Sequence, residues 1–198
     1  NTQPNVSLKF NEGFMTIVGI DARHYYPLLT HTILAMRLAG ATSFGSERML
    51  YYLGNIDNPL LPNIKTDRPD ALLRGFNTDI PVPTDGNFAF EAPANNLRGF
   101  GLNIRNGSSY ALFNSELRVP VFKYLLHRKP SLGSFWRNFQ LTGFFDVGTA
   151  WQGLSPYSGD NPINIVPKNN PPTVYMNVKY FRDSLVAGYG AGVRMQLL

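Results

Sequence analysis

The sequence lacks several features that would point to common protein classes. It has 198 residues and no cysteine, which excludes disulfide frameworks and thiolate metal sites. No run of 18 or more apolar residues occurs, which excludes a transmembrane helix but not a membrane barrel. The formal charge is +5, yet the densest basic cluster is only His127-Arg128-Lys129. A solvated turn explains that cluster better than a nucleic-acid site, so we expect no nucleic-acid partner.

Signs of catalysis are also missing. The three histidines, His24, His31 and His127, lie in or beside predicted turns, with no serine or carboxylate at a suggestive spacing. A glycine-rich stretch at 188–192 lies inside a predicted strand and opens no helix, so a phosphate-binding loop is a weak interpretation. We therefore expect no catalytic residues, no metal ion and no cofactor, and we predict that the protein is not an enzyme.

Five segments alternate large apolar residues with polar or small ones. They span residues 14–26, 33–45, 108–122, 139–151 and 185–198. Such alternation is typical of β-strands, because successive side chains point to opposite faces. Strands of soluble proteins usually have about 5–6 residues, whereas a strand that crosses a bilayer needs about 9–11. The length of these segments favours membrane-crossing strands with one face toward lipid and one toward a wet lumen.

The charged residues inside these segments follow the alternation. All of them lie on the parity opposite the large apolar residues: Asp21, Arg23, Arg37, Glu116, Arg118, Asp146 and Arg194. One charge facing lipid at the middle of a bilayer costs about 2–4 kcal/mol, so a barrel has a reason to keep this separation. His24 is the one ionisable residue on the apolar parity, and it lies near a strand end, where an interfacial position costs little.

The connections between these segments alternate in length. Residues 27–31 form a short turn and residues 123–138 a moderate one, whereas residues 46–107 and 152–184 form long loops. Short turns at one end and long loops at the other are typical of bacterial outer-membrane barrels. In a compact soluble domain, a loop of about sixty residues would count against the strand assignment.

One set of residues follows a specific order and spacing. An Arg-Gly-Phe tip on the long loop is followed by a strand with a Glu shortly before a Pro, and then by a strand reading Phe-x-Asp-x-Gly-x-x-Trp. These motif residues are Arg98, Gly99, Phe100, Glu116, Phe144, Asp146, Gly148 and Trp151. In this combination the chain resembles the superfamily of the BamA barrel and the two-partner-secretion transporters, also called the bacterial surface antigen family. Residues 49–58 and 188–198 look like members from Bacteroidetes-type bacteria.

The resemblance implies a fold and a function. The family barrel has 16 antiparallel strands in the bacterial outer membrane, with a long loop folded into the lumen. We accordingly expect an all-β fold, in which residues 1–198 supply about five strands of one barrel domain, its C-terminal part. The implied function is insertion, assembly or translocation of proteins at the outer membrane. The implied partners are outer-membrane lipid, client or passenger proteins, and periplasmic or lipoprotein subunits.

The residue types in the motif give it a physical role. An arginine fork binds carboxylates bidentately, and Glu116 and Asp146 share the polar parity of two strands that should be neighbours. We predict that Arg98 pairs with both of them and pins the loop, while Gly99 permits a tight turn and Phe100 packs on the wall. Taken singly, each charge reads as an ordinary solvated residue. The shared order and spacing favour the pairing of Arg98 with Glu116 and Asp146, which we call the pin.

Some alternatives stay open at the level of sequence. Residues 73–76 repeat the tetrapeptide Leu-Arg-Gly-Phe, so Arg74 is an alternative loop tip. The glycines Gly188, Gly190 and Gly192 either leave room for an inserted loop or permit strand curvature. For function, a passive or gated outer-membrane pore and a soluble all-β binding module are the two alternatives to protein assembly or translocation.

Overall fold

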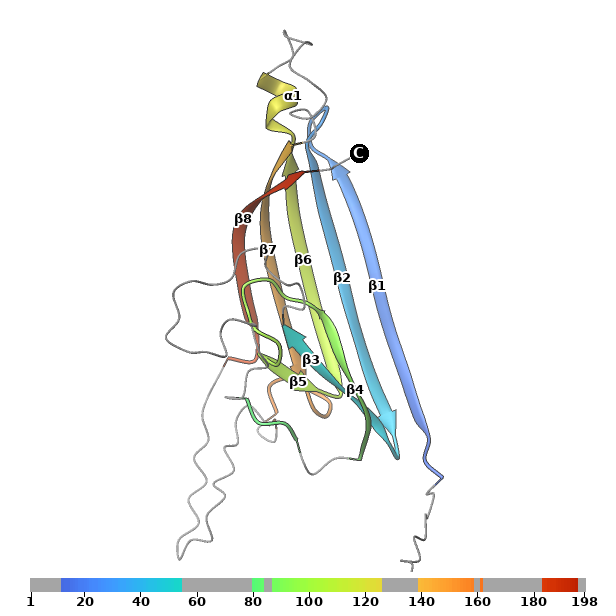
Figure 1. The fold of residues 1–198 in the computed structure, drawn as a ribbon. Helices are drawn as coiled ribbons and strands as arrows, with labels where there is room; N and C mark the ends of the chain where they lie inside the picture. Colours follow the sequence, from blue (N-terminus) through green and yellow to red (C-terminus); the bar gives the residue numbers. More distant parts are fainter. Residues whose placement is uncertain are drawn as a thin grey trace, which may run out of the picture.

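The chain forms an almost entirely β structure. The computed structural model describes residues 12–54, 80–83, 87–125, 139–158, 161 and 183–195. In chain order (Figure 1) the elements are β1 (Met15–Pro27), β2 (Ile33–Gly45), β3 (Arg48–Gly54), β4 (Phe88–Asn96), β5 (Arg105–Gly107), β6 (Ser109–Val119), α1 (Val121–Leu125), β7 (Phe139–Trp151) and β8 (Val186–Met195). Within these ranges, no helix is long and apolar enough to cross a membrane.

The main sheet contains the five predicted strands. Its order is β1-β2-β6-β7-β8, and every neighbouring pair is antiparallel. Strands β2 and β7 have the predicted bounds, and β1 is shifted by one residue. Strand β6 ends at Val119 because Pro120 follows, and a proline cannot donate to the ladder. The turn after β1 is closed by the Leu28 N–H, which donates to the Thr32 carbonyl at 3.0 Å.

The long loop predicted at residues 46–107 contains strands that the sequence interpretation did not find. Its described part, residues 46–54, 80–83 and 87–107, contains three strands that make a second sheet of order β4-β3-β5, in which β3 and β4 are parallel. Strand β3 escaped detection because residues 50–54 are buried without interruption, so its apolar residues do not alternate. Strand β5 has three residues, too few for a periodic signal. The described part of the second long loop, residues 152–158, 161 and 183–184, contains no strand.

The register of the main sheet separates its two faces as the alternation predicts. Directly paired residues share a face, and Arg37, Asn114 and Asp146 follow one another across β2, β6 and β7. We call this the charged face, since all seven charged residues of the five strands lie on it. The opposite, apolar face carries large side chains that are between 47% and 86% exposed: Val18, Ile20, Leu38, Leu141, Phe145, Tyr189 and Val193.

The buried core lies between the two sheets. We call residues 48–54 and 88–107 the plug; Figure 1 shows it lying across the lower half of the main sheet, at the end opposite the β1–β2 turn. Leu53 and Leu97 from the plug pack against Leu112 and Ala150 on the charged face, and all four are at most 1% exposed. Gly148 makes room for this contact, because an added Cβ would lie 2.9 Å from Leu112 Cδ1. The apolar face takes no part in this core.

Replacing Leu97 by alanine tests whether the plug and the sheet form one cooperative unit. The substitution removes a fully buried side chain between them, so the free energy of unfolding should fall by about 2–5 kcal/mol. Leu154→Ala is the matched control, since Leu154 is fully exposed and its loss should change little. Denaturant unfolding of the two variants and of the unaltered protein measures both effects. Equal stability of the two variants would show that the plug does not contribute to the fold.

Candidate functional site

Arg98 lies at the tip of the plug segment that connects β4 to β5. The end of β3 holds this segment on both sides of the tip: the Leu97 N–H donates to the Gly54 carbonyl and the Ile104 N–H to the Leu53 carbonyl, each at 3.0 Å. Gly99 has a φ of +94°, which is strained for any residue with a Cβ. The tight turn expected at Gly99 is therefore present, and it directs Arg98 toward the charged face.

The Arg98 side chain binds both carboxylates that the sequence singled out. Its Nε and Nη2 donate to the two oxygens of Asp146, at 2.7 and 2.8 Å, and its Nη1 donates to Glu116 Oε2 at 2.6 Å. The Arg98 backbone N–H adds a fourth bond, to Asp146 Oδ2 at 3.1 Å. Asp146 is completely buried. A buried carboxylate requires such partners, so this arrangement fixes the tip of the plug on β7 and β6.

The ion pairs extend to a second arginine. Arg118 Nε donates to Glu116 Oε1 at 2.7 Å, so each oxygen of Glu116 accepts from a different guanidinium. Burial lowers the pKa of Arg98, but the hydrogen bonds and charges of Asp146 and Glu116 more than offset this, and the net shift is upward. The group therefore stays charged, and its function in the structure is electrostatic.

Phe144 and the glycines of β8 complete the site. The Arg98 guanidinium lies over the Phe144 ring, 4.1 Å from the centroid, in a cation–π contact. A Cβ on Gly190 would lie 2.7 Å from that ring, and a Cβ on Gly188 would overlap the Arg98 carbonyl oxygen. Gly188 therefore leaves room for the inserted loop, one of the two interpretations that the sequence left open, whereas Gly190 leaves room for the Phe144 ring of the neighbouring strand β7.

The remaining motif residues have structural positions around the pin. Phe100 packs against the core between plug and sheet, with its ring 3.2 Å from where a Gly188 Cβ would stand. Trp151 is the last residue of β7 and contributes its backbone, against which Gly107 packs too closely for any side chain. Arg74, the alternative tip, lies outside the described residues. Arg98 is the tip that the described residues bring to Glu116 and Asp146.

Two contacts of the plug were missed by the sequence interpretation. Asn114 Nδ2 donates to the carbonyl of Asn96, the last residue of β4, at 3.1 Å. Its position two residues before Glu116, on the same parity, was the available signal. Arg105 is buried and donates to the carbonyls of Asp183 and Ser184, which ties β5 to the segment before β8. No sequence pattern indicated that this arginine would be buried.

The contacts of this site anchor the plug to the main sheet. Within the described ranges, no group of three or more His, Asp or Glu side chains could hold a metal ion. Each carboxylate of the cluster is occupied by guanidinium groups. None of the protein family models, curated proteins or solved structures compared with the chain matches it. The family resemblance indicated by the motif accordingly stays a prediction. The contacts of Arg98 with Glu116 and Asp146 do not depend on it.

Removing the Arg98 fork should destabilise the plug strongly. In Arg98→Gln the buried Asp146 keeps its charge and loses its cation, so we expect a loss of about 3–5 kcal/mol in the free energy of unfolding. Adding Asp146→Asn to this variant should restore part of the loss, since no unpaired charge is then buried. Arg194→Gln removes a guanidinium of the same face far from the plug and should change little. A full additional loss on adding Asp146→Asn would contradict the buried pair.

Proposed function

We propose that this chain is part of a transmembrane β-barrel of the bacterial outer membrane, with the apolar face toward lipid and the charged face toward a wet lumen. The observation that carries the proposal is the separation across the main sheet: seven charged residues lie on one face, and large exposed apolar side chains lie on the other. In a soluble monomer such an apolar face would be exposed to water, which is rare for contiguous patches above a few hundred Å². Lipid is the solvent that this face fits.

The two edges of the main sheet support the same proposal. Among the described residues β1 and β8 each pair on one side only, which leaves a row of backbone groups on the other side. Such groups are costly in hydrocarbon, and a barrel satisfies them by adding strands until the sheet closes. We propose that further strands continue the sheet from both edges, to the sixteen of the family that the motif resembles.

For the activity, we propose insertion, assembly or translocation of other proteins at the outer membrane. The support is the motif, whose Arg98, Glu116 and Asp146 meet in one cluster as the resemblance implies. A plug held by ion pairs inside a wet lumen fits a conduit that is closed at rest. The proposed partners are outer-membrane lipid, client or passenger proteins, and periplasmic or lipoprotein subunits.

An arginine placed on either face tests the membrane orientation. Leu38→Arg puts a charge on the apolar face and should lower the free energy of unfolding in lipid vesicles by about 2–4 kcal/mol. Gln140→Arg adds the same side chain to the charged face, where it lies opposite Arg194, so repulsion should limit the loss to less than about 1 kcal/mol. The guanidine dependence of unfolding measures both variants in the parent protein. Equal effects of the two substitutions would argue against lipid on the apolar face.

Depletion of the parent protein from its host tests the activity. We expect a lower amount of folded outer-membrane proteins, or loss of one secreted passenger, measured by quantitative proteomics of the outer-membrane and medium fractions. Unchanged protein levels, together with ion conductance of the purified protein in planar bilayers, would favour a pore. Extraction of the native protein without detergent would favour a soluble binding module.

A further inference from the structure

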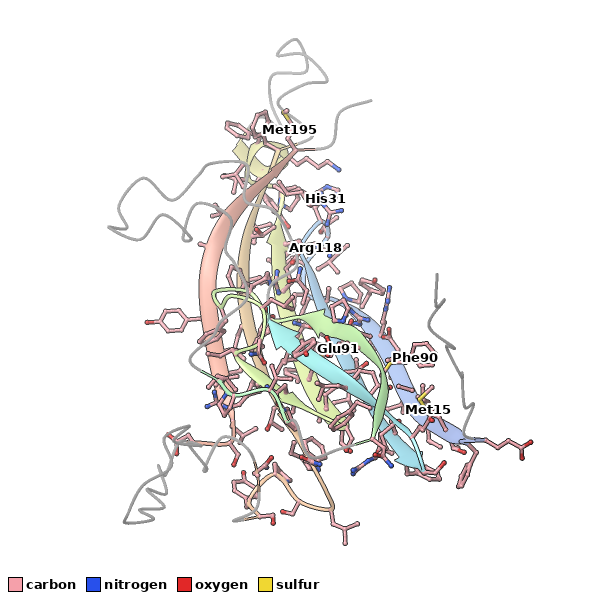
Figure 2. All side chains as sticks on the ribbon, turned by 60° about the horizontal axis from the view of Figure 1, so that its bottom comes forward. Met15, His31, Phe90, Glu91, Arg118 and Met195 are labelled. Atoms are coloured by element: carbon pink, nitrogen blue, oxygen red, sulfur yellow. The ribbon has the colours of Figure 1, made fainter. Side chains whose placement is uncertain are left out.

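A hollow of about 310 Å³ lies on the charged face beside the plug. Its lining comes from β1, β2, β6 and the tip of the plug, and it includes Arg23, Arg37, Asn114 and Arg118 as well as Arg98. Figure 2 labels Arg118, which lies on the sheet between the plug and the turn that carries His31. The pin explains Arg98. It does not explain why three further arginines face the same space.

Two of the arginines that line this hollow, Arg23 and Arg37, share one carboxylate, that of Asp21. Asp21 Oδ1 accepts from the Nε of both Arg23 and Arg37, at 3.2 and 3.0 Å. Its Oδ2 accepts from the Nη2 of the same two residues, at 3.1 and 2.6 Å. Each guanidinium binds Asp21 through its Nε and Nη2 atoms, so both carboxylate oxygens already accept two hydrogen bonds. Asp21 therefore has little capacity left for the other nitrogens of either arginine.

The arginines retain donors that the described residues do not use. Each guanidinium carries five N–H groups. Within the described part of the chain, Arg23 Nη1, Arg37 Nη1 and both Nη atoms of Arg118 have no hydrogen-bond partner. Arg37 and Arg118 are only 27% and 28% exposed, so water solvates them incompletely. These unused N–H groups belong to planar, permanently charged guanidinium groups.

The balance of charge at the hollow is positive. Four arginines, Arg23, Arg37, Arg98 and Arg118, contribute four positive charges. Three carboxylates, Asp21, Glu116 and Asp146, pair with them, which leaves one net positive charge. All three carboxylates already accept hydrogen bonds from guanidinium groups, whereas several guanidinium N–H groups still have no acceptor among the described residues. A further acceptor with negative charge would complete the cluster.

We propose that this hollow is a binding site for an oxyanion of the phosphate or carboxylate class. Arg37 and Arg118 hold it through their unused Nη groups, and Arg23 closes the β1 side. Guanidinium forks match the oxygens of both anions, which is why arginine dominates such sites. The oxyanion comes either from a free anion or from the acidic side chain of a polypeptide that passes over the charged face. All of these arginines belong to the charged face, so the proposal does not depend on whether lipid or water covers the apolar face.

Equilibrium dialysis of the detergent-solubilised parent protein tests the site with two probes. The first is radiolabelled inorganic phosphate. The second is an end-blocked extended peptide with one glutamate, compared with the same peptide carrying glutamine. We expect saturable binding of at least one anionic probe, and a loss of affinity of roughly tenfold in Arg37→Gln, because hydrogen bonds to charged groups have about that effect. Arg37→Gln leaves Arg23 on Asp21, so the carboxylate keeps a partner.

Control variants decide the outcome. Arg194→Gln removes an arginine from the same face outside the hollow and should leave affinity unchanged. Arg37→Lys keeps the charge but loses the fork, and it should bind more weakly than the unaltered protein. Arg118→Gln provides the same test from β6 if Arg37→Gln does not fold. Phosphate binding identifies a free anion, and binding of the glutamate peptide alone identifies a polypeptide source. Binding of neither probe, or equal losses in Arg37→Gln and Arg194→Gln, would overturn the proposal whatever the protein does in the membrane.

Discussion

The buried ion pair between Arg98 and Asp146 is the interaction on which the arrangement of the two sheets depends. Asp146 is fully buried and would carry a heavy desolvation penalty if its charge were unmatched. A bidentate fork, a backbone N–H and a second carboxylate surround the pair. A buried pair is weak evidence for stability, because apolar residues can stabilise as well. Its value here is specificity, since no neighbouring position on the sheet offers the tip the same set of partners.

Several elements support that pair from a distance. The end of β3 holds the chain on both sides of the tip, Gly99 gives the turn, and Gly188 gives the clearance on β8. Leu97 and Phe100 flank Arg98 in sequence and anchor it in the core. Apolar packing on either side of Arg98 thus positions the charged tip. This explains why a polar contact can be positioned accurately on a face that is otherwise open.

The sequence predicted the main sheet well and the plug poorly, for physical reasons. Strands such as β2 and β7 separate two environments, so their composition alternates and their bounds can be read directly. Strand β3 is buried on both faces, and its apolar run carries no period. The pairing of Arg98 was predicted from the order and spacing of the motif that the family resemblance supplies, and the arginine fork and the shared parity of the two carboxylates gave it a physical reason. The shared binding of Asp21 was not predicted, since it depends on the register between β1 and β2.

The position of the pin along the chain has a consequence for biogenesis. Arg98 precedes Asp146 by 48 residues, and β6 lies between them. During synthesis the tip therefore leaves the ribosome well before β7, the strand that carries its buried counter-ion Asp146. Until β7 follows, Glu116 on β6 is the one carboxylate of the cluster that Arg98 can reach. The bidentate contact with Asp146 therefore cannot form before β7 is synthesised, and the polypeptide up to β6 exists with this contact still open.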